Sequence, residues 1–284
     1  MTRVVRTAAE RRATVVFMGS PDFALPNLKA LAHHYEVVGV VTQPDRASGR
    51  GRELKPPPVK LLAQELNIPV IQPEKLRQPE AMEQLRAWKP DLIVMGARGH
   101  SVFGGRLILG SISQRVLYEA RCSVRIARAS DRNADKPVRL LIGVDSSADS
   151  NAAVEAVRSR DWPRGTEVGL LAVVDTVMPL TSNPSEPAAM KWIEVGDESN
   201  WNQVREIFEP AAQIIRSAGL HAEVLIRRGN PADEILDEAH TWGADCIFVG
   251  AKGTRGIDRL LLGSVSSAVS SRAHCSVEVV RPKK

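Results

Sequence analysis

The chain contains an internal repeat, and this repeat constrains its fold more than any other feature of the sequence. Residues 91–128 read DLIVMGARGHSVFGGRLILGSISQRVLYEARCSVRIAR, and residues 245–281 read DCIFVGAKGTRGIDRLLLGSVSSAVSSRAHCSVEVVR. The two copies share GAxG, RLxLGSxS and CSVxxxR, with one extra residue in the first copy between Gly99 and Arg106. Self-similarity of this kind indicates that one structural unit occurs twice. We therefore expect two related halves, joined by the polar segment 129–137.

Each half alternates short apolar runs with amphipathic segments, which is the pattern of strand–helix units on a parallel sheet. The runs TVVFMG, EVVGVVT, IPVIQ, DLIVMG and CSVRIA predict strands in the first half, and VRLLIGVD, EVGLLAVVD, HAEVLIRRG, DCIFVGA and SVEVVR predict strands in the second. A helix is expected over 201–218, with a kink or break at Pro210. The sequence thus predicts an α/β protein with two tandem open parallel five-stranded sheets, each flanked by helices. The expected domains are residues 1–130 and 136–284.

The composition excludes several classes of protein. Of the 284 residues, 43% are hydrophobic and 25% are charged, which is typical of a folded globular chain. No apolar run approaches the roughly 20 residues of a membrane-spanning helix. Cys122, Cys246 and Cys275 are an odd number and form no CxxC pair, which argues against a disulfide framework or a zinc cluster. We expect a cytoplasmic protein with no membrane partner and no metal site.

A glycine-containing loop in the second half has the features of an anion-binding site. Gly250 and Gly253 follow a predicted strand, and Gly263 lies inside the apolar pattern LLLGSVSSAV of the helix expected over 258–272. Glycines at a strand end let the backbone approach a phosphate, while the N–H groups of the following helix point at it. The hydroxyls of Ser264 and Ser266 are further candidate donors. Asp145 ends the first strand of this half, where it would accept a hydrogen bond from adenine or ribose; alternatively, it only caps the following helix.

The second half resembles the universal stress protein family. The segments VDSS, VGAKG, RLLLGSVSSAV and HCSVEVVR carry this resemblance, which covers residues 136–282. Nucleotide-binding members have a G-2x-G-9x-G-(S/T) loop, which Gly250, Gly253, Gly263 and Ser264 match. The resemblance implies a Rossmann-like fold of the adenine nucleotide alpha hydrolase type, with ATP, alone or with Mg²⁺, lying across the switch point of the sheet. The implied binding residues are Val144, Asp145, Val173, Val249, Gly250, Gly253, Gly263, Ser264, Val265 and Ser266, with Asp145 and Val173 beside the adenosine.

The first half is a hybrid. Residues 91–128 resemble the same family, although ten residues separate Gly99 from Gly110. Residues 14–95, including the segment TQPDRASGRG, resemble the start of methionyl-tRNA formyltransferase. In that family the basic loop corresponding to Pro44–Lys60 contacts tRNA, whereas here we interpret it as a solvated loop without that role. The family's Asn-x-His element and distant Asp do not follow, so we expect formyl transfer to be lost.

These observations lead to three hypotheses about function. The first is an ATP-binding stress-response protein that acts by nucleotide-dependent switching or by binding a partner protein, with at most slow ATP hydrolysis and no assigned catalytic residue. The second is a formyltransferase-like protein that has lost its Asn, His and Asp set. The third is a nucleotide-free structural protein. The repeated final strands SVRIAR and SVEVVR also predict edge pairing, either within one chain as a pseudo-dimer or between two copies.

Overall fold

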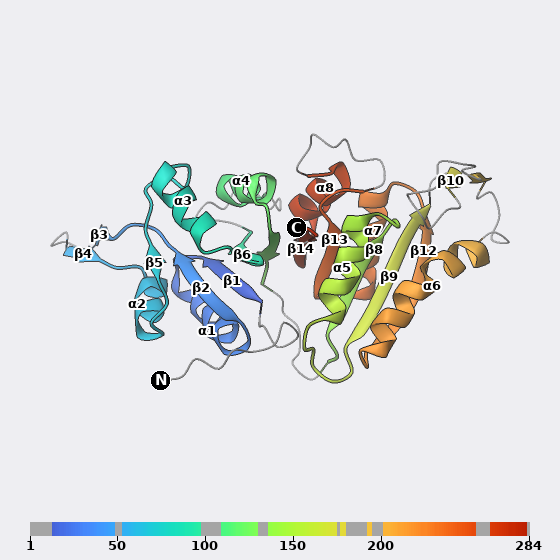
Figure 1. Ribbon diagram of the computed structural model, residues 1–284, viewed down its shortest axis with the longest axis horizontal. Helices are drawn as coiled ribbons and strands as arrows, with labels where there is room; N and C mark the ends of the chain where they lie inside the picture. The colour runs from blue at the N-terminus through green and yellow to red at the C-terminus, as the bar shows by residue number, and fades with distance from the viewer. Residues whose placement is uncertain are drawn as a thin grey trace. The chain divides into compact units, whose positions relative to one another are not determined.

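The computed structural model describes residues 13–48, 53–97, 109–129, 136–174, 177–179, 192–194, 201–253 and 262–282. The chain forms two compact units, Met1–Gly96 and Ala97–Lys284 (Figure 1). Both have the predicted α/β organisation, with parallel strands joined by helices. The prediction of fold class is therefore confirmed. The repeat predicts that residues 1–130 and residues 136–284 fold as separate domains, and this stays a prediction.

Unit 1 is built on four parallel strands. Their order is β6-β1-β2-β5, with β1 hydrogen-bonded to both β2 and β6. The strands are β1 (Thr14–Met18), β2 (Glu36–Val41), β5 (Val70–Ile71) and β6 (Leu92–Gly96). The connecting helices are η2 (Asp22–Ala24), α1 (Leu25–His34), α2 (Pro58–Glu65) and α3 (Pro79–Ala87). Val15, Phe17 and Leu28 lie in the core, because both faces of β1 are covered and its five residues are all buried.

Unit 2 contains five parallel strands and one antiparallel strand. The order is β12-β9-β8-β13-β14-β7, in which β7 runs antiparallel to β14. The strands are β7 (Ser123–Ala127), β8 (Arg139–Val144), β9 (Glu167–Val174), β12 (His221–Arg228), β13 (Cys246–Gly250) and β14 (Ser276–Val280). The helices are α4 (Ser111–Glu119), α5 (Ala148–Arg158), α6 (Trp201–Ser217), α7 (Pro231–Trp242) and α8 (Ser264–Arg272). The strand expected to end the first half, CSVRIA, is thus β7 and pairs with the final strand of the second.

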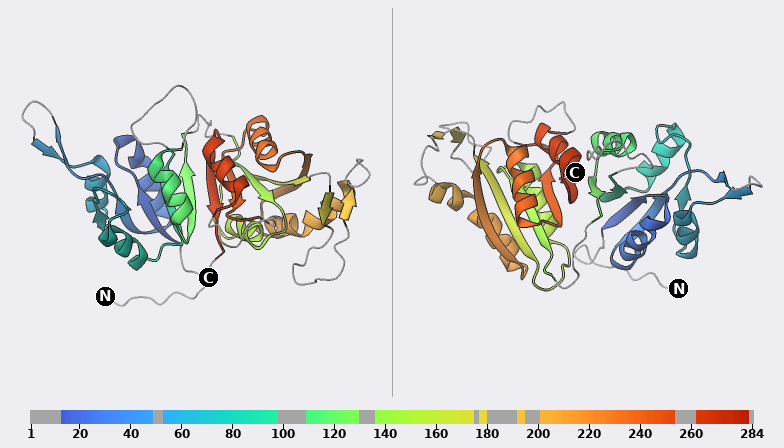
Figure 2. Two further views of the ribbon diagram at one scale, coloured as in Figure 1. Left: turned by 90° about the horizontal axis from the view of Figure 1, so that it is seen from above. Right: turned by 180° about the vertical axis from the view of Figure 1, so that it is seen from behind.

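The sheet of unit 2 has helices on both faces. Helices α5 and α6 pack together on one face, and α7 and α8 pack together on the other (Figures 1 and 2). The core between α5, α6 and the sheet includes Leu140, Leu170, Phe208 and Phe248. Because the crossovers bury both faces of the strands, the ligand-accessible part of such a sheet is the edge formed by the carboxyl ends of the strands.

Two short antiparallel ribbons lie outside these sheets. In unit 1, β3 (Arg46–Ser48) pairs with β4 (Glu53–Lys55) within the segment expected to be a solvated loop. In unit 2, β10 (Val177–Pro179) pairs with β11 (Trp192–Glu194). Within the described ranges, no helix is both long enough and apolar enough to cross a bilayer.

Candidate functional site

The candidate site lies where β8 and β13 end in unit 2. These strands are parallel neighbours, with Leu140 opposite Cys246 and Ile142 opposite Phe248. Their carboxyl ends therefore meet at one edge of the sheet. Val144 and Val249 end the buried parts of the two strands, at 6% and 3% exposure. On the other side of β8, Val144 pairs with Ala172 of β9, so the half-buried Val173 follows at the same edge.

Asp145 directly follows β8 and lies at the carboxyl end of this strand. The backbone reverses at Ser146, which has a φ of 63°, and Ser147 then begins α5 as its N-cap. Ser147 Oγ accepts a hydrogen bond from the Ser150 N–H at 3.1 Å, and Asp145 Oδ1 accepts one from the Ser147 N–H at 3.1 Å. The helix cap that was one interpretation of Asp145 is therefore supplied by Ser147 instead. Asp145 orders the turn that precedes the helix.

The glycines of the loop after β13 are required by close contacts inside the protein. A Cβ on Gly250 would lie 2.7 Å from the backbone of Asp149, and a Cβ on Gly253 would lie 2.6 Å from Asp145 Oδ2. The loop returns to the sheet through a hydrogen bond of 2.7 Å from the Gly263 N–H to the Ala251 carbonyl. The first two glycines thus let the β13 loop lie directly against the β8 turn. This contact joins Asp145 and the glycine loop into one site.

The start of α8 presents a backbone that no side chain caps. Gly263 is the N-cap and has no side chain to bond the N–H groups of the first turn. Ser264 is exposed and Val265 is half-buried, so the first turn is accessible. Ser266 is 3% exposed, and its Oγ donates to the Gly250 and Ala251 carbonyls at 2.8 and 3.0 Å. The Ser266 hydroxyl therefore holds the glycine loop in place, whereas Ser264 is exposed to solvent.

Three residues of this site were not identified from the sequence. Ser147 Oγ donates to the Lys252 carbonyl at 3.3 Å, and Asp149 Oδ2 accepts from the Lys252 N–H at 3.0 Å. Burial raises the pKa of Asp149, although the Lys252 N–H bond opposes this effect. Both contacts tie the start of α5 to the glycine loop. The pattern DSSAD after a strand was the available signal, because a serine two positions after the strand is a common N-cap.

The first repeat reproduces part of this arrangement. The Gly110 N–H bonds to the Ala97 carbonyl at 2.9 Å, as Gly263 does to Ala251, and Gly110 caps α4 without a side chain. Ser111 is exposed and Ser113 is buried, like Ser264 and Ser266. The Gly99 part of the loop lies outside the described residues. The start of α4 is thus a structural equivalent of the start of α8.

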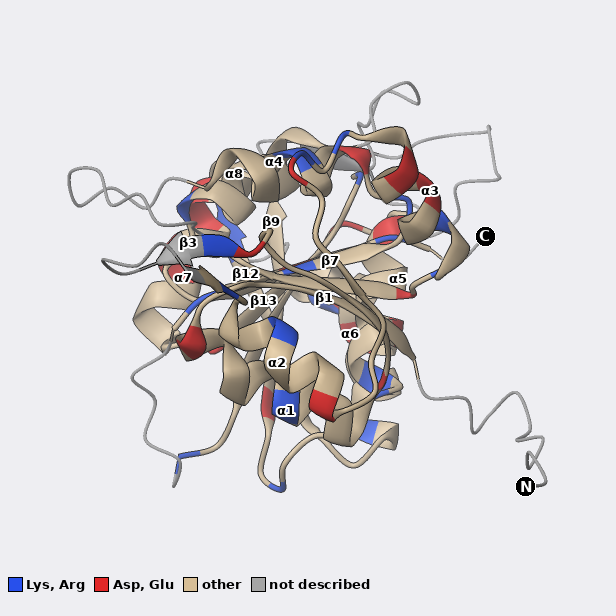
Figure 3. Cartoon of the chain, turned by 90° about the vertical axis from the view of Figure 1, so that its left-hand side faces the viewer, with Lys and Arg blue, Asp and Glu red and all other residues tan. Residues whose placement is uncertain are grey.

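The basic segment of unit 1 is partly neutralised. Lys60 Nζ donates to both carboxylate oxygens of Asp45, at 2.9 and 2.7 Å, and Gln72 donates to Asp45 Oδ1 at 2.7 Å. These bonds, from Gln72 and then Lys60, lower the pKa of Asp45. Along the rest of the chain drawn in Figure 3, acidic residues are interspersed with basic ones. Arg50 and Arg52 lie outside the described residues. In the described part of the chain, no group of three or more His, Cys, Asp or Glu residues converges as a metal site would require.

Comparison with known proteins identifies relatives for both halves. A model of the Universal stress protein family matches residues 60–128 and 138–281. A methionyl-tRNA formyltransferase from Xylella fastidiosa is 58% identical over 85 residues, and one from Geobacillus thermodenitrificans is 59% identical over 86 residues. Each of these matches spans 30% of this chain, in a partial N-terminal segment, and only 28% and 27% of the relatives. Both expected resemblances are confirmed, and the stress-protein pattern reaches further back in the first half than residue 91.

Two solved structures match nearly the whole chain in fold. A universal stress protein from Archaeoglobus fulgidus aligns with a TM-score of 0.56 and 20% identity, covering 96% of this chain and 98% of that one. A protein described as functionally unknown, from Pseudomonas aeruginosa, aligns with a TM-score of 0.61 and 15% identity, covering 97% and 94%. At these identities the likeness concerns the fold.

Proposed function

Because the chain belongs to the universal stress protein family, we propose that unit 2 binds ATP at the joined ends of β8 and β13. The observation that carries this proposal is the contact between the β8 turn and the glycine loop, in which Gly253 leaves only enough room for Asp145. The loop then leads to a helix start that is capped by glycine and open to solvent. The phosphates would lie on the loop between Gly250 and Ser266, and the adenosine between Asp145 and Val173.

The chemistry of these groups suits a nucleoside triphosphate. The N–H groups at the start of α8 carry the positive end of the helix dipole, which attracts anions. The exposed Ser264 hydroxyl adds a donor, and Lys252 adds a positive charge to the loop. The second oxygen of Asp145 is an acceptor suited to an adenine amino group or a ribose hydroxyl. Any Mg²⁺ would enter bound to the phosphates, and Asp145 and Asp149 would supply carboxylates beside the glycine loop.

We propose that the bound nucleotide controls association with a partner protein during stress and is hydrolysed slowly at most. The Asp149 carboxylate accepts a hydrogen bond from the Lys252 backbone, and Asp145 accepts one from Ser147. Both carboxylates therefore serve the geometry of the site. The same bonds link the glycine loop to the start of α5, so a ligand that moves the loop would also move the start of this helix. Through this linkage, nucleotide binding would change the surface that α5 presents to a partner protein.

The test is an equilibrium titration of ATP into the full-length protein and into two matched variants. Ser264→Asp adds a carboxylate at the proposed phosphate position, while an acidic residue in a first helical turn keeps α8 stable. We expect the Kd for ATP to rise at least about tenfold, which corresponds to a repulsion of about 1.4 kcal/mol. Ser111→Asp makes the same change at the equivalent position of α4 and should leave the Kd unchanged. Equal effects of the two substitutions, or no saturable binding by the unaltered protein, would refute the proposal.

The adenosine half of the proposal is tested separately at Asp145. Asp145→Asn keeps an oxygen that can accept from the Ser147 N–H, so the turn is preserved. It removes the negative charge and one of the two acceptor oxygens on the side of Gly253. We expect weaker ATP binding with an unchanged thermal midpoint, and a smaller effect on binding of inorganic triphosphate. An identical loss for ATP and triphosphate would place the adenosine elsewhere.

The N-terminal likeness to formyltransferases supports a second candidate. A segment that is 58% identical over 85 residues to such an enzyme argues for a formyltransferase-like activity on an aminoacyl-tRNA. The printed sequence, however, contains no Asn-x-His element after DLIVMG. Formyl transfer needs a group that polarises the formyl amide and handles its proton. We expect no formylated product from 10-formyltetrahydrofolate and initiator methionyl-tRNA, and turnover in that assay would favour this candidate over nucleotide-dependent switching.

A further inference from the structure

The pairing of β7 with β14 is centred on two opposite charges. In this antiparallel ladder, Glu278 of β14 lies directly opposite Arg125 of β7. The pairs on either side are apolar, Val277 with Ile126 and Val279 with Val124. The 153 residues that separate Arg125 from Glu278 are also the offset between the two repeats at their final strands. The charged pair therefore joins equivalent positions of the two repeats.

The contacts around this pair are reciprocal. The Arg128 N–H donates to Ser276 Oγ at 3.1 Å, and the Arg281 N–H donates to Ser123 Oγ at 3.2 Å. Each arginine side chain also crosses to the other repeat in the same manner. Arg128 donates to the carbonyls of Cys275 and Ser270, and Arg281 to those of Cys122 and Leu117. These contacts would form equally well between two copies of either strand, so they do not determine which strands pair.

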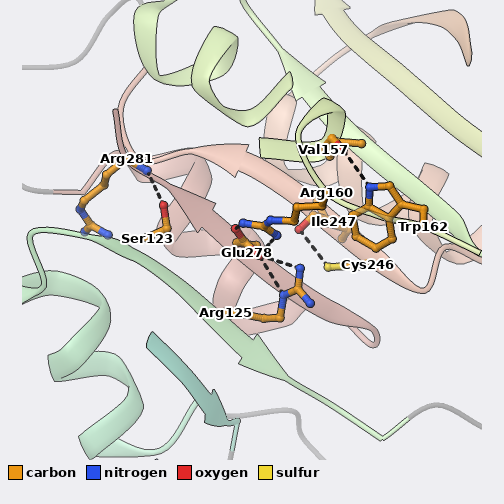
Figure 4. Close-up of polar contacts among 9 residues, drawn as sticks. All are labelled: Ser123, Arg125, Val157, Arg160, Trp162, Cys246, Ile247, Glu278 and Arg281. Atoms are coloured by element: carbon orange, nitrogen blue, oxygen red, sulfur yellow. Dashed lines mark hydrogen bonds and ion pairs between the residues drawn. The ribbon is translucent and has the colours of Figure 1, made fainter. Parts of the chain in front are cut away.

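The centre of the ladder is the place where the repeats differ in charge. Glu278 is fully buried, and its carboxylate accepts from Arg125 Nε at 2.8 Å and from both terminal nitrogens of Arg160 at 2.8 and 2.5 Å (Figure 4). Both guanidinium groups also lie over the Phe248 ring, 5.6 and 5.7 Å from its centroid. Burying an ionised carboxylate is costly unless it is paired. The buried Glu278 thus requires a partner strand that carries a cation at the matching position.

We propose that Arg125 and Glu278 are a specificity pair. They make β14 pair with β7, either of the same chain or of a second copy, and prevent β14 from pairing with another β14. Two copies of β14 would bring Glu278 against Glu278, so that each carboxylate loses one guanidinium and gains a like charge. Two copies of β7 would bring Arg125 against Arg125 with no acid between them. Only the mixed pairing keeps an acid between two guanidinium groups. Like charges opposed across a ladder are destabilising, and such opposition is how interfaces reject wrong partners.

The test exchanges strands between two full-length variants. In Arg125→Glu two carboxylates oppose each other within the chain, and in Glu278→Arg three guanidinium groups meet. When the two variants are unfolded and refolded together, β7 of each can find an oppositely charged β14 on the other. We expect affinity-tagged Arg125→Glu to retain at least about tenfold more untagged Glu278→Arg than untagged Arg125→Glu, the ratio that a difference of about 1.4 kcal/mol produces. Equal retention, or none while both variants are folded, overturns the proposal.

Three further variants serve as controls for this test. Arg115→Glu and Glu119→Arg reverse an exposed ion pair on α4, outside the ladder, and co-refolding them should give no retention above background. The double exchange Arg125→Glu/Glu278→Arg restores opposite charges within one chain. If the single variants fail to fold, this double variant should still refold as a monomer with a cooperative transition. Failure of the double variant, like the single ones, would mean that the pair is only structural and would refute a role in strand choice.

Discussion

The buried carboxylate of Glu278 predicts a specific dependence of stability on pH. Burial alone would raise its pKa, but Arg160 and then Arg125 outweigh burial and lower the pKa of Glu278 to about 2, from an ordinary value of 4.5. A group whose pKa falls on folding stabilises the protein above its unfolded pKa and loses that contribution as the pH falls through its folded pKa. The stabilisation from Glu278 should therefore be complete above about pH 5 and be lost between pH 4.5 and pH 2.

The magnitude follows from the same two values. Each pKa unit corresponds to about 1.4 kcal/mol, so a fall from 4.5 to about 2 is worth about 3 kcal/mol. Removing one partner of a buried ion pair costs about 3–5 kcal/mol, because the remaining charge stays buried without compensation. Glu278→Gln leaves Arg125 and Arg160 facing a neutral amide of the same size. At pH 7 it should lower the free energy of unfolding of unit 2 by about 3 kcal/mol.

The assay compares the two proteins across the pH range. Hydrogen exchange at the β14 amides, followed by mass spectrometry, gives the opening free energy of this part of the sheet from pH 7 to pH 5, and denaturant unfolding extends the comparison to pH 2. The gap between the unaltered protein and Glu278→Gln should be about 3 kcal/mol at pH 7 and close to zero at pH 2. Parallel curves with a constant gap would show that Glu278 does not titrate with a lowered pKa, which would refute the reasoning.

Three other predictions follow from individual contacts. Gly39→Ala would place a Cβ 2.5 Å from the Trp88 ring, so it should lower the thermal midpoint of unit 1 through overpacking of about 1–3 kcal/mol, measured by circular dichroism. Ser147→Ala removes the cap of α5 and should cost about 1 kcal/mol in denaturant unfolding, whereas Ser147→Thr should not. Burial raises the pKa of Cys246 to about 11 and that of Cys275 to about 12, so iodoacetamide at pH 8 should label both only after unfolding; labelling of the native protein would contradict their burial.

Much of the fold could be predicted from local patterns. The buried strands coincide with apolar runs, and β1 occupies the first five residues of the run TVVFMG. Of the two outcomes expected at Pro210, a kink or a break, the break is wrong, because α6 continues from Trp201 to Ser217. The kink stays a prediction. Val204, Phe208 and Ile215 on its buried face anchor both sides of the proline. The packing of this amphipathic face against the sheet thus outweighs the loss of helix stability caused by proline. Sequence periodicity alone does not show which of the two effects is larger.

The site was predictable in outline but not in its bonding. The glycine spacing identified the loop because it is a local pattern in the sequence, although the contacts that require Gly250 and Gly253 are with Asp149 and Asp145 of another segment. The roles of Ser147 and Ser266 depend on partners in other segments, Lys252 and the Gly250 carbonyl, and no pattern within either segment reveals them. The β3–β4 ribbon was missed because its two short strands lie in a segment that lacks apolar alternation.

Joining both repeats in one polypeptide has a consequence for how the central pair arose. In a symmetric homodimer, a residue on the twofold axis always meets its own copy, so a single gene cannot place opposite charges there. Within a tandem chain, the codons of Arg125 and Glu278 mutate independently while the reciprocal bonds of Arg128 and Arg281 stay intact. Duplication within one chain therefore permits two opposite charges, Arg125 and Glu278, at the position where a symmetric homodimer would have two identical residues.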